Sequence, residues 1–394
     1  EAVRSIREDF NFSMCLSIFK HILSGRNQMK NIHGGDIYQY NNILDFSANI
    51  NPLGAPESVK MAITDAIGQI GCYPEMYSDS LRKAIGEKYY IDSSQIICGN
   101  GAADVIYRYV YAVRPRKIMV TAPCFAEYEA AFCSLWVDHI SEKKGIANHL
   151  KTEEASHKIA VYPLNHRDFC IKEDILEQIE KEKPGVIFLC NPNNPTGVLI
   201  PSLLLEKILQ LCSRENIRLF LDECFLDFTG QEEDLTLVGK LNQYPNLFIL
   251  RAFTKMYAMA GVRLGFGMTA DTEVIEQMYQ TGPPWNVSVL ASAAGKAALK
   301  EDDFVKETMQ YISKEKEYLY RALDTLRVRY WKSAANYILL KSDPDLKKWL
   351  ITEGILIRDC SNYRNLSEGY FRIAVKSHAD NEKLIAALKV VLER

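Results

Sequence analysis

Residues 246–265 read Asn-Leu-Phe-Ile-Leu-Arg-Ala-Phe-Thr-Lys-Met-Tyr-Ala-Met-Ala-Gly-Val-Arg-Leu-Gly. The apolar run at the start predicts a strand over Asn246–Arg251 that is buried on both faces of a sheet. Lys255 follows this strand and stands among apolar residues, which lower the pKa of an amine by desolvation and free it to attack a carbonyl group. A lone lysine is more often a surface group with a buried stem, so the stretch has to be weighed together with its surroundings.

Similar apolar runs recur on both sides of this stretch, and helical patterns separate most of them. One such pattern covers Leu203–Cys212, which has apolar side chains along one side. Alternating strands and helices indicate a mainly parallel sheet with both faces covered. The seven predicted strands are Gln95–Gly99, Lys117–Thr121, Lys158–Tyr162, Val186–Cys190, Ile217–Asp222, Asn246–Arg251 and Leu264–Met268.

The pattern changes after residue 285. A long helical region over Val287–Leu326 leads into predicted strands at Tyr337–Leu340, Ile355–Ile357 and Tyr370–Val375, and a last helix follows them. This part predicts a smaller α+β domain. We therefore expect a large domain over residues 62–285 and a small domain made of residues 29–61 and 286–394. Residues 1–28 are expected to be an N-terminal extension of unknown role.

Composition argues against several classes of function. The chain has 394 residues, a formal net charge of -3 and a pI of about 6.2. It lacks the excess of positive charge that is typical of proteins that bind nucleic acids. No apolar run approaches the roughly 20 residues of a membrane span. The cysteines lack paired metal-ligand spacing, and we expect no metal site. An acidic start without a cleavage site argues against a secretory signal, and we expect a cytoplasmic protein.

Polar residues follow the predicted strands at the edge where open α/β sheets bind ligands. Gly101, Ala102 and Ala103 follow the first strand and lead into a helix, whose N-terminal N–H groups can hold a phosphate. Asn194 lies in an irregular loop with two prolines after the fourth strand. Asp222 ends a buried strand, where a carboxylate is costly unless a group such as a protonated pyridine nitrogen pairs with it. Taken alone, each motif also fits a plain structural role, such as a strand–helix turn or a salt-bridged aspartate.

The joint order of Asn194, Asp222, Lys255 and Arg263 resembles that of the fold-type I enzymes that depend on pyridoxal 5′-phosphate (PLP). The resemblance spans about residues 33–392. It implies an α/β fold like that of aspartate aminotransferase, with a mainly parallel seven-stranded sheet in the large domain and a small α+β domain. It also implies PLP as the cofactor.

The resemblance implies a role for each of these residues. Lys255 corresponds to the Schiff-base lysine, Asp222 to the partner of the pyridinium nitrogen, and Asn194 to the residue that bonds the phenolic oxygen of the ring. Tyr73 corresponds to a tyrosine that reaches the phosphate in the neighbouring subunit, which implies a homodimer with shared active sites. The other residues implied to hold the cofactor are Gly101, Ala102, Ala103, Thr254 and Arg263 around the phosphate, and Phe125 and Tyr128 around the ring.

Two groups within this superfamily are closest in pattern. Histidinol-phosphate aminotransferases share most of the motifs, whereas several stretches are more similar to threonine-phosphate decarboxylases, which make the aminopropanol phosphate linker of cobalamin. These stretches are His33–Gly35, Asp45–Gly54, Arg251–Lys255 and Ile357–Tyr363. Phe225 and Ala252 stand where aminotransferases carry hydroxyl groups. This departure also favours similarity to the threonine-phosphate decarboxylases.

The resemblance also implies a phosphorylated amino acid as the substrate. Arg372 matches the arginine that binds the substrate carboxylate, and Arg358 matches an extra arginine of enzymes with phosphorylated substrates. His33, Asn49 and Asn194 are expected as further substrate contacts, although a structural role for His33 is equally consistent with the Gly-Gly turn that follows it. Which arginine binds which anion stays open at this point.

The favoured hypothesis is decarboxylation of L-threonine O-3-phosphate to (R)-1-aminopropan-2-yl phosphate, with L-serine O-phosphate as a second substrate. The first alternative is a histidinol-phosphate aminotransferase. The second is a protein of the same fold that has lost catalysis and binds or regulates. The presence of Lys255, Asp222 and Asn194 argues against this last alternative.

Overall fold

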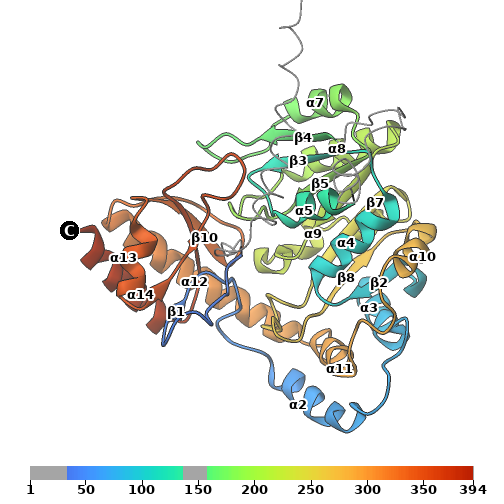
Figure 1. Cartoon of the computed structure of the whole chain (residues 1–394), viewed down its shortest axis with the longest axis horizontal. Helices are drawn as coiled ribbons and strands as arrows, with labels where there is room; N and C mark the ends of the chain where they lie inside the picture. The colour runs from blue at the N-terminus through green and yellow to red at the C-terminus, as the bar shows by residue number, and fades with distance from the viewer. Residues whose placement is uncertain (1–32, 136–157, 394) are drawn as a thin grey trace, which may run out of the picture.

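The computed structural model describes residues 33–135 and 158–393. The expected N-terminal extension, residues 1–28, lies outside the described residues. Figure 1 shows two bodies of structure, one around the sheet that contains β3, β5 and β7 and the other containing β10, α13 and α14 near the C-terminus.

The large sheet has seven strands in the order β2-β8-β7-β6-β5-β3-β4. Strands β3 to β7 run parallel to their neighbours, and β8 is antiparallel to both β7 and β2. The seven predicted strands and the mainly parallel sheet are thus confirmed, with ends that differ by about one residue. The strands are β2 (Ile96–Gly99), β3 (Lys117–Ala122), β4 (Lys158–Pro163), β5 (Val186–Cys190), β6 (Arg218–Asp222), β7 (Leu247–Ala252) and β8 (Gly265–Met268).

Alternate residues of these strands enter two separate cores, because successive side chains of a strand point to opposite faces. Leu219 and Leu221 of β6 pack in one core, whereas Phe220 packs in the other. The first core holds the apolar faces of α3 (Asp79–Tyr89), α7 (Asp174–Glu182), α8 (Ser202–Arg214) and α11 (Val289–Ala298). The second holds those of α4 (Ala102–Val113), α5 (Glu127–Ser134) and α10 (Thr272–Gln280).

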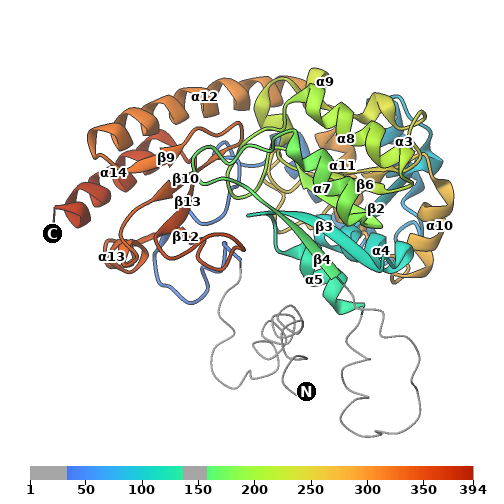
Figure 2. The same cartoon turned by 90° about the horizontal axis from the view of Figure 1, so that it is seen from above.

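The small domain is built around a four-stranded antiparallel sheet in the order β12-β13-β10-β9. A separate parallel pair joins β1 (Leu44–Asp45), from the N-terminal part of the chain, to β11 (Ile355–Leu356). The sheet strands are β9 (Arg329–Trp331), β10 (Tyr337–Lys341), β12 (Arg358–Asp359) and β13 (Tyr370–Ala374), and the covering helices are α12 (Asp302–Thr325), α13 (Leu346–Thr352) and α14 (His378–Leu392). In Figure 2, α12 extends from this domain over to the large one.

The helical region predicted over Val287–Leu326 consists of two helices, α11 and α12. Helix α11 ends before Leu299, and α12 begins at Asp302 with acidic residues in its first turn, where the helix dipole favours them. The break lets α11 pack on α2 (Glu57–Ala66) while α12 packs on α14. Both α2 and α11 contribute to a core of the large sheet, so the division at residues 61 and 285 stays a prediction.

Short helical segments complete the described chain. They are η1 (Ile67–Gln69), η2 (Ser93–Gln95), η3 (Leu226–Thr229), α9 (Glu232–Leu235) and η4 (Val238–Lys240). A search of the described residues finds no helix with the length and apolarity that crossing a bilayer requires. The same residues contain no group of three or more His, Cys, Asp or Glu side chains placed to hold a metal ion.

Candidate active site

The predicted site residues lie along one edge of the large sheet. Strands β2, β3, β5, β6 and β7 all point their C-terminal ends to this edge, because β8 is antiparallel to β2 and to β7. Gly101, Phe125, Asn194, Asp222 and Lys255 each follow or end one of these five strands. This is the edge where open α/β sheets place their ligands.

A narrow cradle forms where β2 turns into α4. Gly101 has a φ of 85°, a backbone conformation that glycine adopts without steric cost. A Cβ atom on Gly101 would lie 2.5 Å from Nη2 of Arg263, and one on Gly265 would lie 2.6 Å from the backbone nitrogen of Ala102. The guanidinium of Arg263 therefore sits directly against the start of α4, beside Ala102 and Ala103. Exposed N–H groups at a helix start and an adjacent guanidinium together suit a phosphate.

Asp222 is buried at the end of β6, with 5% of its surface exposed. Its Oδ2 accepts a hydrogen bond from the Tyr128 hydroxyl at 2.6 Å, and its Oδ1 accepts one from the backbone N–H of Cys224 at 2.9 Å. Burial raises the pKa of the carboxyl group, and these two hydrogen bonds oppose that rise. Among the described residues Asp222 forms no ion pair, so a bound cationic group would complete its environment.

Aromatic rings lie beside this carboxylate. Tyr128 stacks on Phe188 with centroids 5.3 Å apart, and Phe125 meets Tyr128 edge-on at 5.7 Å. Phe125 is partly exposed while Tyr128 is fully buried, so Phe125 offers its ring to a ligand and Tyr128 holds the carboxylate of Asp222.

Lys255 follows β7 and is partly buried, and Thr254 before it is buried. The pKa of the Lys255 amine is lowered from 10.5 to about 8, first by desolvation and then by the positive charge of Arg372, with a further contribution from Arg263. The backbone carbonyl of Lys255 accepts a hydrogen bond from the N–H of Asn51 at 3.1 Å, which ties the lysine segment to the N-terminal part of the chain. A substantial fraction of the amine is thus neutral near pH 8, as a nucleophile requires.

Arg372 and Arg358 come from neighbouring strands of the small sheet. They are direct Cα partners in the antiparallel pair β12–β13, and both are buried. Arg372 donates to Oδ1 of Asn194 at 2.5 Å and to the carbonyl oxygen of Ser47 at 3.0 Å, whereas its Nε has no hydrogen-bond partner among the described residues. Arg358 donates to Oδ1 of Asn362 at 3.0 Å.

Three more predicted residues are His33, Asn49 and Tyr73. His33 places Nε2 2.8 Å from Oε1 of Glu127, and its ring centroid is 6.1 Å from that of Phe125. Asn49 is buried, and its Oδ1 has no partner in the described part of the chain. Tyr73 is 82% exposed and packs against Trp285, and within the described residues no hydrogen bond, ion pair or ring contact joins it to another predicted site residue.

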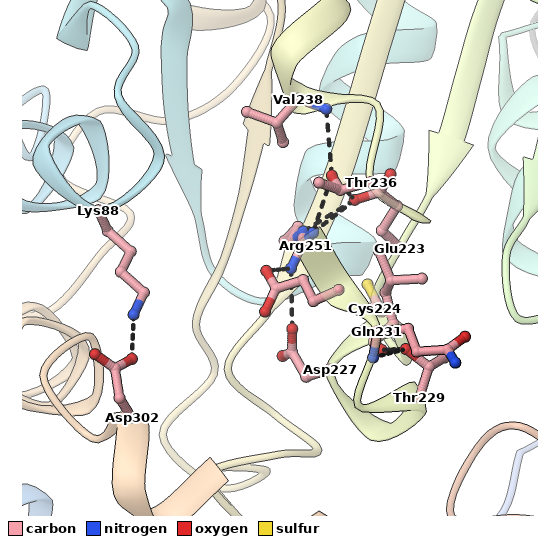
Figure 3. A network of polar contacts seen from close by, with 12 residues as sticks. Lys88, Glu223, Cys224, Asp227, Thr229, Gln231, Thr236, Val238, Arg251 and Asp302 are labelled. Carbon is pink, nitrogen blue, oxygen red and sulfur yellow. Dashed lines mark hydrogen bonds and ion pairs between the residues drawn. The ribbon is translucent and has the colours of Figure 1, made fainter. Parts of the chain in front are cut away.

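A buried network beneath the site was missed by the sequence analysis. Arg251 lies on β7 with 2% of its surface exposed, and its guanidinium contacts Glu223 at 2.7 Å, Asp227 at 2.9 Å and Glu232 (Figure 3). Oε2 of Glu223 also accepts a hydrogen bond from Thr236 at 2.8 Å. A charged residue inside an apolar strand was the available signal, because such a charge has to be paired.

This network joins β6, which ends at Asp222, to β7, which leads into Lys255. Glu223 directly follows Asp222, and Arg251 precedes Lys255 by four residues. The ion pair between Glu223 and Arg251 therefore fastens the ends of β6 and β7 to each other.

The donor set fits the cofactor that the sequence resemblance implies. The uncompensated carboxylate of Asp222 suits a protonated pyridine ring, the cradle at Gly101 and Arg263 suits a phosphate, and Lys255 is a nucleophilic amine. The unpaired Nε of Arg372 leaves a donor for an anionic substrate.

Comparison with known proteins supports the same interpretation. Residues 151–388 match the model of the family described as aminotransferase class I and II. The threonine-phosphate decarboxylase of Salmonella typhimurium is 35% identical over 91% of this chain and 96% of its own length.

Solved structures resemble the whole fold. The histidinol-phosphate aminotransferase of Clostridium acetobutylicum has a TM-score of 0.77 at 30% identity, covering 89% of this chain and 99% of its own. The L-threonine-O-3-phosphate decarboxylase of Porphyromonas gingivalis has a TM-score of 0.74 at 25% identity, with the same coverage of both chains. The chain therefore belongs to the class I and II aminotransferase family, with the fold-type I architecture and pyridoxal 5′-phosphate as its cofactor.

Proposed function

We propose that this protein decarboxylates an O-phosphorylated amino acid. The favoured substrate is L-threonine O-3-phosphate, which would yield (R)-1-aminopropan-2-yl phosphate for the cobalamin linker, with L-serine O-phosphate as a second substrate. The observation that carries the proposal is the pair of buried arginines, Arg358 and Arg372, directly opposite each other on β12 and β13.

Like charges directly opposite on neighbouring strands destabilise a sheet, and burial adds a cost of desolvation. A ligand with two anionic groups would offset both costs. A phosphorylated amino acid carries a carboxylate and a phosphate a few bonds apart, and guanidinium groups bind each of them with paired hydrogen bonds. We assign the carboxylate to Arg372, which contacts Asn194 and influences Lys255, and the phosphate to Arg358.

When bound, the cofactor supplies a protonated ring that withdraws electrons from the bond that breaks at the substrate α-carbon. Asp222 keeps the ring nitrogen protonated from its buried position. Arg372 and Arg358 would hold the two anionic groups of the substrate and so determine that the bond to the carboxylate, rather than the bond to hydrogen, is the one exposed to the cofactor. The bond from the α-carbon to the carboxylate breaks, carbon dioxide leaves, and Lys255 donates a proton to the α-carbon.

Phe225 supports decarboxylation over transamination. It stands where aminotransferases of this superfamily carry a tyrosine, and its ring is buried and meets Tyr337 edge-on at 5.0 Å. The side chain therefore offers no hydroxyl to the cofactor ring. Ala252, which is also buried, likewise lacks the hydroxyl of its counterpart.

One assay tests the proposal against its first alternative. Purified protein with PLP is given threonine phosphate or serine phosphate, and released carbon dioxide is measured; histidinol phosphate with 2-oxoglutarate is the control. We expect carbon dioxide from at least one phosphorylated amino acid without any oxo acid. Amino transfer from histidinol phosphate without carbon dioxide release would make the protein an aminotransferase.

A spectrum tests the non-catalytic alternative. Wild-type protein with PLP should show the absorbance of a lysine Schiff base, and Lys255→Ala should not. A wild-type protein that binds PLP without this band would rule out both enzymatic readings.

We also propose a homodimer with shared active sites. Tyr73 and Trp285 form an exposed aromatic pair with ring centroids 4.9 Å apart, 82% and 39% exposed. A second copy that covers this pair would receive Tyr73 near its own cofactor. Light scattering of the purified protein should give twice the mass of the chain, and a monomer would contradict this part of the proposal.

A further inference from the structure

The loop between β12 and β13 connects the arginine pair to the large domain. It carries Tyr363, whose ring lies with its centroid 5.4 Å from the guanidinium carbon of Arg358. The Tyr363 hydroxyl is 3.4 Å from Oδ1 of Asn194, the atom that also accepts from Arg372. Tyr363 thus contacts Arg358 on one side and the Asn194 loop of the large domain on the other.

The next residue forms a two-pronged ion pair with the large domain. Nε of Arg364 lies 3.1 Å from Oε1 of Glu129, and its Nη2 lies 2.5 Å from Oε2. The two side chains are 25% and 13% exposed. Paired hydrogen bonds between a guanidinium and a carboxylate fix orientation as well as distance.

Asn365 adds a second attachment, to the edge of the large sheet. Its side-chain amide donates to the carbonyl oxygen of Ala122 at 3.0 Å and to that of Leu164 at 2.9 Å. These carbonyl groups lie at the C-terminal ends of β3 and β4. Nε2 of His166 is 2.6 Å from the Asn365 carbonyl oxygen, and its Nδ1 is 3.0 Å from the Tyr370 hydroxyl. Asn365 has a φ of 64°, a conformation that asparagine tolerates better than most residues.

Both attachments end next to the groups that surround the cofactor ring. Glu129 lies in the first turn of α5, directly after Tyr128, which bonds Asp222. Ala122 is three residues before Phe125. The loop therefore spans from the substrate arginines to the elements that hold the ring.

We propose that Arg364 and Asn365 are positioning residues that hold Tyr363 and Arg358 at the distance from the cofactor that the substrate phosphate requires. The substrate class in this statement rests on the proposed function, whereas the role of the two residues in anion binding does not. Without these attachments the loop would keep its fold on the small domain, but Arg358 would no longer be held in register with Lys255.

The test compares Arg364→Ala and Asn365→Gly with wild type and with Arg167→Ala. Arg167 is an exposed arginine of the neighbouring Leu164–Asp168 segment, so its removal makes the same change in charge. Glycine at position 365 keeps the left-handed backbone while it removes the amide. The Schiff-base absorbance with PLP should stay at the wild-type level in all of these variants, because Lys255 is untouched.

The affinity for anions should fall in the two loop variants only. We expect KM for threonine phosphate to rise about 10- to 100-fold, as for a misplaced binding group, with kcat within about threefold of wild type. The affinity for inorganic phosphate, measured from its effect on the Schiff-base absorbance, should fall in parallel. The charge-swapped protein with Glu129→Arg and Arg364→Glu should recover a large part of the loss, which a merely structural defect would not allow.

The outcomes separate this proposal from the proposed function. Anion affinities equal to wild type in both loop variants would overturn the positioning role, as would a loss of the same size in Arg167→Ala. A wild type that binds phosphate but releases no carbon dioxide would overturn only the proposed function. A wild type that binds neither threonine phosphate nor inorganic phosphate would overturn both.

Discussion

Two buried arginines of this protein, Arg251 and Arg372, differ in the groups that surround their guanidinium charges. Arg251, 2% exposed, is surrounded by three carboxylates of its own chain, those of Glu223, Asp227 and Glu232. Arg372, 6% exposed, donates hydrogen bonds to neutral oxygen atoms of Asn194 and Ser47 and forms no ion pair with the described residues.

The difference distinguishes a charge that serves the fold from one that serves a ligand. A buried ion pair is costly to break, because removal of one partner leaves the other charged and unsolvated. A buried cation without an anionic partner is costly as it stands, and binding of an anion repays the cost. The network of Arg251 should therefore be sensitive in unfolding experiments, and Arg372 in binding experiments.

The largest expected effect is on stability. Arg251→Met should lower the free energy of unfolding by about 3–5 kcal/mol at neutral pH, because the buried carboxylate of Glu223 and the partly buried ones of Asp227 and Glu232 lose their common cation. Arg372→Met should cost less than this, because the loss of its two hydrogen bonds is offset by removal of a buried cation that has no anionic partner among the described residues. Urea unfolding of the two purified variants measures both changes. Equal losses would remove the distinction between the two arginines.

The next effect is on activity, and here the Arg372 variant should be affected more than the Arg251 variant. In Arg372→Met, kcat/KM for the phosphorylated amino acid should fall about 10- to 150-fold, which corresponds to about 1.5–3 kcal/mol for hydrogen bonds to a charged group. Steady-state assays under conditions where the variant is fully folded measure this change. An unchanged kcat/KM would show that Arg372 binds no anionic part of the substrate.

A smaller effect concerns the pH dependence of stability, because three carboxyl groups surround the single charge of Arg251. Burial, together with the charge of Glu232, raises the pKa of Asp227 from 3.8 to about 7. The folded chain thus keeps a proton that the unfolded chain releases between about pH 4 and pH 7, so this group makes stability fall as pH rises through that window. Asp227→Asn should flatten this fall. Unfolding curves at pH 5 and pH 8 would show it, and an unchanged pH dependence would argue against a protonated Asp227.

The smallest effect links Arg372 to Lys255. The pKa of Lys255 is about 8 in part because Arg372 lies near, so capture of PLP by the cofactor-free protein should accelerate as pH rises through 8. In Arg372→Met the positive neighbour is lost, the pKa of Lys255 rises, and the midpoint should move to higher pH. Stopped-flow absorbance measures the rate. A midpoint that stays in place would mean that Arg372 does not contribute to the lowered pKa of Lys255.

Sequence patterns predicted the large sheet well and the small domain less completely. The seven strands of the large sheet are apolar runs with polar ends, so their positions could be placed to about one residue. Strands β1, β9 and β12 span only two or three residues, which is too short for a periodic pattern. The break between α11 and α12 was also invisible, because both helices continue the same spacing of apolar residues.

The position of Asp222 and Lys255 at one edge of the sheet could be predicted, because each ends or follows a buried apolar strand, whereas their chemical roles stay predictions. The Arg251 network was not predicted, because its partners are spread over residues 223–232 and only the folded chain brings them to one guanidinium. The attachments of Arg364 and Asn365 were missed for the same reason. Their partners Glu129 and Ala122 are more than 200 residues away in the chain.

Adjacent residues at the end of β6 face in opposite directions, since Asp222 bonds Tyr128 and Glu223 bonds Arg251. Randomising the Glu223 side would mostly yield unfolded protein. A directed-evolution library aimed at new substrates should therefore vary the residues of the small domain around Arg358. It should leave Glu223 and the other residues that contact Arg251 unchanged.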